Sequence, residues 1–403
     1  MLKHFLSRLT IFSLLFCLAC TERDGAQNVK YAGQTPEVKL EPKEGLRSIL
    51  MSEYIDSVRY VPLETTEQSL LEDIAKIRFK DGRIYILNRN KNYNCQSICV
   101  FDMNGRFLNR IKKVGKGPGE YLNIRNFYLD DQGILIHDNW SKVIKRYGFD
   151  GEFVEETPFA EKRTTMERMA NGYYAIETSG LSNEFDTVKD DYKPSGYRLK
   201  VLNPKGELVY QALEDRGIFT GWGKQAPFFK RGDSLYFLPL CRDSLYLVEK
   251  DRIKAVMAFN FGKFHKERSE NIAKAIPGKQ IKGFGDIVRV LMTDTHLVVE
   301  YSHNNIVCFA LVDKNTLEVI RHADSFSLDG PGFSLRPATV CGNEWVSWIQ
   351  TFSIAQSLEK DPDGLNTGTI GSQLGAEYLK NLNGEENPIL AFYTLKKRKA
   401  KEK

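Results

Sequence analysis

The segment 74–87 reads IAKIRFKDGRIYIL, and the segment 98–111 reads ICVFDMNGRFLNRI. Each holds two runs rich in β-branched and aromatic residues, separated by a short polar turn that contains glycine. Such a pattern is typical of a β-hairpin. The first hairpin turns at Lys80–Arg83 and the second at Asp102–Gly105. Joined by a polar loop, the two hairpins predict a unit of four antiparallel strands.

The same unit recurs along the rest of the chain, with almost no helical periodicity between the copies. Turns of the same kind follow at Asp130–Gly133, Phe149–Gly151, Ala170–Gly172, Asn203–Gly206, Lys230–Asp233, Glu249–Asp251, Thr293–Thr295, Asp313–Thr316 and Cys341–Asn343. Repeats of about 40–60 residues with four strands each are the signature of propeller blades. We therefore predict an all-β fold, a six-bladed β-propeller of four-stranded antiparallel blades.

The sixth copy lacks a fourth strand, because the charged run Lys396–Lys403 follows its third. An unpaired strand edge tends to pair with another strand, and the run Ser57–Leu63 has no partner in the first copy. We predict that this N-terminal run pairs beside Ile389–Leu395 and closes the ring.

Three motifs support this fold through a resemblance. They are Val100–Phe107 (VFDMNGRF), Gly115–Tyr121 (GKGPGEY) and Tyr60–Thr65 (YVPLET). In these motifs the sequence resembles the six-bladed β-propeller lipoproteins of Gram-negative anaerobes, which are relatives of NHL-repeat and TolB-like propellers and mostly lack an assigned function. The resemblance implies a fold and a location in the cell envelope, and it implies no chemistry.

The N-terminus has the pattern of a targeting segment. Basic residues precede the apolar run Leu9–Ala19, which is too short to span a bilayer comfortably and fits a secretory signal. The run ends at Leu18-Ala19-Cys20, which resembles the bacterial lipobox, so we expect cleavage before Cys20 and acylation of its thiol. The alternative is an ordinary signal peptide with an incidental cysteine. We predict a signal peptide at 1–19, a tether at 20–53 and the propeller at 54–403. The protein would then be an outer-membrane lipoprotein, held by its lipid on the periplasmic side or at the cell surface.

Charge and cysteine content exclude several classes of protein. Lys and Arg number 57 against 52 Asp and Glu, so the net charge is only 57 − 52 = +5, and no basic stripe for nucleic acid is present. Five cysteines follow Cys20, an odd number at irregular spacings, which argues against a disulfide framework or a zinc site. We expect Cys99, Cys308 and Cys341 to be buried in strands.

The two faces of the predicted propeller differ. Loops between the second and third strands of a blade, and those between blades, emerge on one face, and the remaining turns emerge on the other. Nearly all long segments fall on the first face: Asn88–Gln96, Lys112–Arg125, Pro158–Arg168, Ser179–Gly196, Asp215–Pro227, Phe264–Asp286 and Thr351–Asn387. Long loops often carry function, so we expect ligand binding there. The candidate binding residues are Lys116, Glu120, Tyr121, Arg125, Trp140 and Trp222.

Two chemical hypotheses accompany these residues. The rings of Tyr93, Tyr121, Trp140 and Trp222 could stack on sugars or peptides, with packing between loops as the alternative. The Gly117–Gly119 turn could form a nest of backbone N–H groups that holds a carboxylate or sulfate together with Lys116 or Arg125. The alternative is a purely structural turn, since glycine supplies the positive φ that a sharp return needs.

Evidence for catalysis in the sequence is sparse. Asn88, Asp138 and Glu177 end equivalent strands and could bind Ca²⁺, although solvated strand ends explain them equally well. His137 and His303 belong to no recognisable triad, and no cofactor is expected. We favour a protein that binds a glycan, a peptide or a protein partner in nutrient handling or sensing. The alternative is an enzyme on the same scaffold, a lactonase-like hydrolase or a polysaccharide lyase or hydrolase, with its site at the axial mouth.

Overall fold

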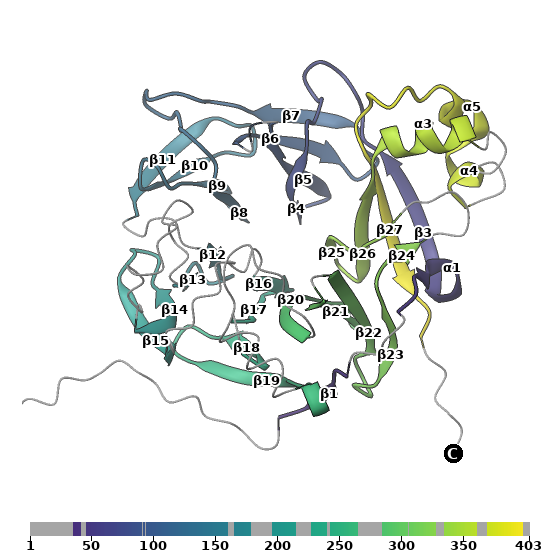
Figure 1. Ribbon diagram of the computed structural model, residues 1–403. Coiled ribbons are helices and arrows are strands. Elements are labelled where there is room, and N and C mark those ends of the chain that lie inside the picture. The colour runs from purple at the N-terminus through teal and green to yellow at the C-terminus, as the bar shows by residue number, and fades with distance from the viewer. Residues whose placement is uncertain are drawn as a thin grey trace, which may run out of the picture.

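The computed structural model describes residues 35–41, 46–90, 92, 94–159, 165–178, 196–214, 227–239, 242–264, 284–304, 306–327, 334–360 and 369–397. The chain forms six sheets of four antiparallel strands arranged around a common axis (Figure 1). This is the six-bladed β-propeller predicted from the repeats. No helix within the described ranges is long and apolar enough to cross a membrane.

Each blade is a meander whose first strand lies nearest the axis (Figure 1). From the axis outward, blade one has β4 (Ile74–Lys80), β5 (Arg83–Arg89), β6 (Cys95–Asp102) and β7 (Phe107–Ile111), and blade two has β8 (Asn126–Asp130), β9 (Gly133–Asp138), β10 (Val143–Tyr147) and β11 (Phe153–Pro158). Blade three has β12 (Thr165–Arg168), β13 (Tyr174–Glu177), β14 (Tyr197–Leu202) and β15 (Leu208–Glu214), and blade four has β16 (Phe228–Arg231), β17 (Ser234–Phe237), β18 (Ser244–Val248) and β19 (Ile253–Asn260). Blade five has β20 (Phe284–Met292), β21 (His296–His303), β22 (Ile306–Asp313) and β23 (Val319–Ala323), and blade six has β25 (Thr339–Cys341), β26 (Glu344–Ile349), β27 (Ile389–Leu395) and β3 (Ile55–Pro62).

Side-chain hydrogen bonds shape several of the predicted turns. In the turn after β6, Oδ1 of Asp102 accepts the backbone N–H groups of Asn104 and Arg106, each at 2.9 Å. Asn203 caps the turn after β14 in the same way, accepting the N–H of Lys205 at 2.9 Å. Asp and Asn favour such turns because their short side chains can bond to the backbone two residues on. The Asp/Asn-rich turn signals in the sequence therefore have a direct physical cause.

The hydrophobic core is divided among the six interfaces between neighbouring blades. Strand β5 shows how alternation produces this arrangement. Ile84 and Ile86 pack towards blade six, while Tyr85 and Leu87 pack towards blade two. Successive side chains of a strand point to opposite faces, so an inner strand that is buried on both faces is apolar throughout.

The ring closes as predicted. Strand β3 is the outermost strand of blade six and pairs antiparallel with β27, with Tyr60 opposite Ala391. The segment after β3 contacts blade one, where Glu64 donates its backbone N–H to the carbonyl of Gly105 at 2.8 Å. A Cβ on Gly105 would lie 2.0 Å from the carbonyl oxygen of Pro62, so only glycine fits there. Two of the motifs that carry the family resemblance thus meet at the closure.

Two expectations need correction. The predicted tether at 20–53 is wrong for its second half, because β1 (Glu37–Lys39) adds a parallel strand outside β19, and β2 (Ile49–Leu50) pairs with β24 (Phe326–Ser327). Both strands, of 3 and 2 residues, are too short for their alternation to be recognised in a sequence.

The chain also contains short helices. The insertion between β26 and β27 contains helices, which the lack of helical periodicity did not predict. The helices and the remaining short elements are α1 (Met51–Tyr54), the 3₁₀ turn Gly262–Phe264, α3 (Thr351–Lys360), α4 (Thr369–Leu374) and α5 (Ala376–Lys380). Each is at most 10 residues long, so their periodicity is brief. They bury Ile354, Ile370 and Leu379 against the core between blades five and six.

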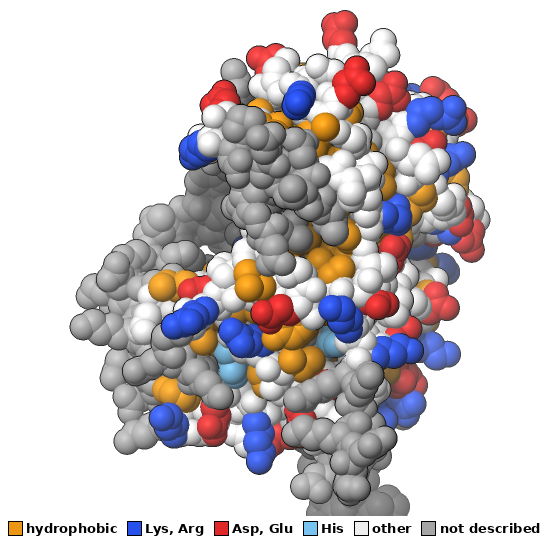
Figure 2. Space-filling view, turned by 90° about the vertical axis from the view of Figure 1, so that its right-hand side faces the viewer, with side chains coloured by type: hydrophobic (Ala, Val, Ile, Leu, Met, Phe, Trp, Pro, Cys, Tyr) orange, Lys and Arg blue, Asp and Glu red, His pale blue; other side chains and the backbone are white. Residues whose placement is uncertain are grey.

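Charges of both signs are mixed on the face shown in Figure 2, where Lys and Arg side chains lie among Asp and Glu side chains. Cys99 and Cys308 are buried as expected, whereas Cys341 is half-buried, and all three are free thiols.

Candidate functional site

The two faces differ as the sequence predicts. On the face of short turns, β4 and β5 are joined by two residues, and so are β16 and β17. On the other face, which we call the loop-rich face, the connection between β26 and β27 carries α3, α4 and α5. Most of the other long connections of this face, with Trp222 and Tyr93, lie outside the described residues.

Polar groups of the 115–121 loop form hydrogen bonds with one another. The carboxylate of Glu120 accepts the N–H of Gly117 at 2.8 Å and thereby occupies the backbone donor that a nest would offer to an external anion. A Cβ on Gly119 would lie 2.7 Å from the Phe153 ring, which favours the structural reading of this turn. Lys116 is exposed, and so is Arg125. Glu120 therefore braces its own loop.

Tyr121 contradicts the expectation of an exposed ring. Its side chain is fully buried, and its hydroxyl donates to the carbonyl of Gln96 at 2.9 Å and accepts the N–H of Lys113 at 3.1 Å. The ring packs edge-on against Tyr147. Tyr121 belongs to the hydrophobic core between blades one and two. A loop sequence does not reveal such packing between blades.

Trp140 is exposed, as predicted, with 61% of its surface accessible. Its loop is held by the buried carboxylate of Asp138, which accepts the backbone N–H of Trp140 at 3.1 Å and the hydroxyl of Ser141 at 2.7 Å. The same carboxylate accepts the N–H of Leu122 at 2.9 Å. Asp138 therefore joins the Trp140 loop to the connector between blades one and two.

The side chains proposed as Ca²⁺ ligands are hydrogen-bonded or buried within the protein. Oδ1 of Asn88 accepts the N–H of Glu72 at 3.0 Å, Asp138 holds the Trp140 loop, and Glu177 is buried at the end of β13. Within the described ranges, no three His, Cys, Asp or Glu side chains gather as a metal site.

The two histidines at this rim lie against aromatic rings. Burial, followed by the charge of Arg125, lowers the pKa of His137 to about 4, so it is neutral at pH 7, and its ring packs edge-on against Phe159. His303 lies edge-on to Phe264.

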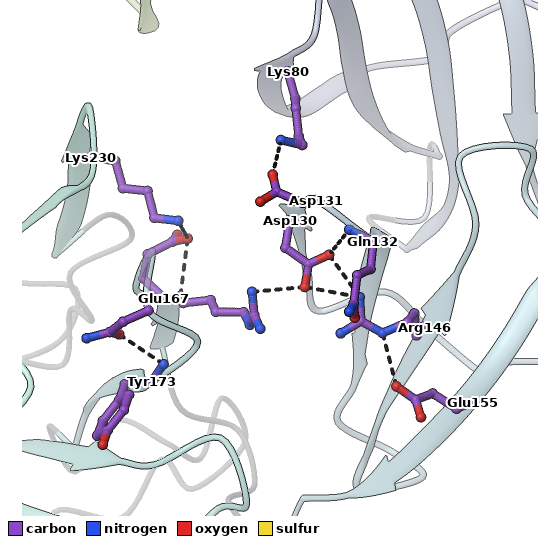
Figure 3. Close-up of polar contacts among 11 residues, drawn as sticks. Lys80, Asp130, Asp131, Gln132, Arg146, Glu155, Glu167, Tyr173 and Lys230 are labelled. Atoms are coloured by element: carbon purple, nitrogen blue, oxygen red, sulfur yellow. Dashed lines mark hydrogen bonds and ion pairs between the residues drawn. The ribbon is translucent and has the colours of Figure 1, made fainter.

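A second polar group lies on the strands nearest the axis, and the sequence reasoning missed it. We call Lys76, Arg78, Asn126, Glu167 and Lys230 the axial cluster. These residues come from β4, β8, β12 and β16, the first strands of four successive blades. Figure 3 shows Lys230 of blade four reaching towards Glu167 of the neighbouring blade three. A signal was present in the sequence, because charged residues alternate in strands that are otherwise apolar, as Lys76 and Arg78 do.

The geometry of the axial cluster centres on one carboxylate and one amide. Glu167 receives Arg78 Nη2 at 2.7 Å and has Lys230 Nζ at 3.7 Å. Oδ1 of Asn126 accepts Lys76 Nζ at 2.9 Å and Arg78 Nη2 at 3.4 Å. Burial alone would raise the pKa of Glu167, but the charges of Arg78, Lys230 and Lys76 outweigh it and hold the value at about 2. The carboxylate is therefore ionised at every physiological pH.

Sequence and structure comparisons place the chain in a family. Its sequence matches the family model described as "Domain of unknown function (DUF4934)" over residues 36–394. The chain belongs to this family. Its structure is similar to that of a Bacteroides fragilis protein classed as exported, with 18% identity, a TM-score of 0.65, and coverage of 90% of this DUF4934 chain and 99% of that chain. A duf4221 family member from Bacteroides vulgatus has 13% identity and a TM-score of 0.47, over 86% and 98% of the two chains. A search of curated proteins gives no match.

Proposed function

We propose that this DUF4934 chain is a lipid-anchored propeller of the cell envelope that binds a glycan, a peptide or a protein partner at its loop-rich face, in nutrient handling or sensing. The observation that carries the proposal is the asymmetry of the two faces, with minimal turns on one and long connections on the other. Hairpin turns need only two to five residues, so the long connections exceed what the fold requires. Function is a common reason for such an excess.

Trp140 is the described residue best placed to contact a ligand. Its indole is exposed, while Asp138 fixes its backbone from a buried position. A rigidly held aromatic ring binds at low entropic cost, and its face suits sugars and peptide side chains. Lys116 and Arg125 supply exposed cations on the connector that Asp138 ties to the Trp140 loop through Leu122.

The test is a thermal-shift screen of the full chain against oligosaccharides and short peptides, followed by titration of any hit. Trp140→Ala should weaken that binding fivefold or more, the loss of a hot-spot contact of about 1–3 kcal/mol, with little change in melting temperature. Val154→Ala is the control, because Val154 is an equally exposed apolar residue (57%) on the outer strand of the same blade. If Trp140→Ala lowers stability by several degrees and leaves affinity unchanged, the ring serves loop packing. Trp222→Ala tests the other predicted tryptophan.

The anchor rests on Cys20, which lies outside the described residues. The similarity to a Bacteroides protein classed as exported supports an envelope location. Wild type should partition with membranes and carry a lipid mass that Cys20→Ala lacks. Mature protein with intact, unmodified Cys20 would overturn this part of the proposal.

The enzymatic alternative, a lactonase-like or polysaccharide-cleaving propeller, would place its site at the axial mouth. A general acid there needs a carboxyl group with a raised pKa. The carboxylate of the axial cluster, Glu167, has its pKa lowered to about 2 instead. This observation favours binding over acid-catalysed hydrolysis, and release of sugar from a polysaccharide or hydrolysis of a lactone by the purified chain would reverse the preference.

A further inference from the structure

The axial cluster carries more positive than negative charge. Glu167 pairs with Arg78 and Lys230, whereas Lys76 bonds to the neutral amide of Asn126, so these residues carry three cations and one carboxylate, an excess of 3 − 1 = 2 positive charges. Unbalanced charge away from bulk water is costly, and proteins retain it mainly where something pairs with it.

Neighbouring charges show that this imbalance is local. Asp130 accepts ion pairs from Arg146 at 2.8 Å and Arg168 at 3.1 Å, and Glu155 pairs with Arg146 at 3.1 Å. We call these four residues the balanced network, since two cations meet two carboxylates. Lys80, on the same strand as Lys76, pairs with Asp131 at 2.8 Å (Figure 3). Within the described residues, the cations of the balanced network and Lys80 therefore have matching carboxylates, which Lys76 lacks.

Some N–H donors of the axial cluster have no acceptor among the described residues. An ammonium group has three N–H donors, and within the described part of the chain Lys76 Nζ meets one acceptor, Oδ1 of Asn126. In the axial cluster, Arg78 Nε is buried with no hydrogen-bond partner among the described residues. The Lys230 side chain retains 30% exposure and Arg78 retains 16%, so small solutes have access to these two cations.

We propose that the axial cluster binds the oxyanion group of a small ligand, a carboxylate, sulfate or phosphate, between the side chains of Lys76, Arg78 and Lys230. Guanidinium and ammonium groups are the usual partners of these anions, and the Arg fork adds directional hydrogen bonds. Glu167 positions Arg78 and Lys230. This site is separate from the loop-rich face around Trp140, and the two proposals stand or fall independently.

Protonation of Lys76 gives the site a pH dependence. Burial, then the charges of Arg78, Arg125 and Lys230, which Glu167 only partly offsets, lower the pKa of Lys76 to about 8. The anion pairs with the cationic form, so affinity should fall as pH rises from 7 to 9.

The experiment is isothermal titration calorimetry of the full chain in mild detergent at pH 7. Sodium sulfate, sodium phosphate and sodium glucuronate are titrated separately, with sodium chloride at equal ionic strength as the reference. We expect saturable binding of at least one oxyanion. The anion that binds most tightly distinguishes an inorganic ligand from a sugar acid.

Variants assign the binding to the cluster. Lys76→Met should weaken binding at least tenfold, while Lys80→Met, the same change on the same strand at a balanced pair, should stay within twofold of wild type. Lys230→Met provides a second test of the site should Lys76→Met fail to fold. Binding no stronger than that of chloride for all three salts overturns the proposal, and so does unchanged oxyanion affinity in folded Lys76→Met or Lys230→Met.

Discussion

The axial cluster and the balanced network share strands β8 and β12, are both built from charged side chains and differ in how their charges are matched. Asp130 in the balanced network is shared by two guanidinium groups, and Glu155 neutralises the surplus. In the axial cluster, Glu167 faces three cations. A matched network is explained by stability, because every ion has its partner inside the protein. An unmatched one is explained by a partner that comes from outside, and the following substitutions test this distinction.

The largest effect should come from Glu167→Gln. Removing this carboxylate leaves three cations facing one another on inner strands, and breaking a buried ion pair costs about 3–5 kcal/mol. Chemical denaturation measured by circular dichroism should show this loss in the free energy of unfolding. Sulfate should restore part of it by supplying the missing negative charge. A loss below 1 kcal/mol would mean that the three cations do not depend on Glu167.

Asp130→Asn should have an intermediate effect. It leaves Arg146 and Arg168 without their shared acceptor, at a cost of about 1–3 kcal/mol. Added sulfate should not rescue this variant, in contrast to Glu167→Gln. Glu155→Gln is the matched control, since Glu155 is 61% exposed, and an exposed pair contributes at most about 1 kcal/mol. If sulfate restores the stability of Asp130→Asn and Glu167→Gln equally, the two regions do not differ in their need for an external anion.

Stability should also depend on pH through Lys76. Its folded-state pKa of about 8 is below the unfolded value of 10.5, so between these two pH values the unfolded chain binds the extra proton. The Lys76 contribution to stability should therefore increase as pH rises from 8 to 10.5. Thermal denaturation should show this increment in wild type relative to Lys76→Met, and saturating sulfate should remove it. Parallel pH profiles of the two proteins would contradict the lowered pKa.

Glu167 works in the opposite direction. Its pKa is lowered from 4.5 to about 2, so its contribution is fully present above pH 4.5 and is lost as pH falls from there towards 2. Wild type and Glu167→Gln should therefore converge in stability at acid pH. A constant difference down to pH 2 would place the stabilisation elsewhere.

Local features of the sequence were enough to predict the blades and the ring closure. Residues such as Asp102, Gly105 and Asn203 determine turns through bonds within four residues, so the turns can be read without knowing the fold. Strand alternation is equally local. The fourth strand of blade six could be predicted because β3 had no partner within blade one, where the four positions are filled by β4 to β7.

Burial and charge matching depended on the tertiary structure. Tyr121 occurs in a glycine-rich loop, and only the packing of blade two against blade one determines that its ring is buried. Strands as short as β1 have no periodicity, so only the edge of β19 determines that Glu37–Lys39 is extended. The residues of the axial cluster span positions 76 to 230 and meet because successive blades turn around one axis. Each of these charges is an ordinary strand residue in the sequence, and its excess over the neighbouring carboxylates exists only in the assembled ring, because Coulomb energies depend on distance in space.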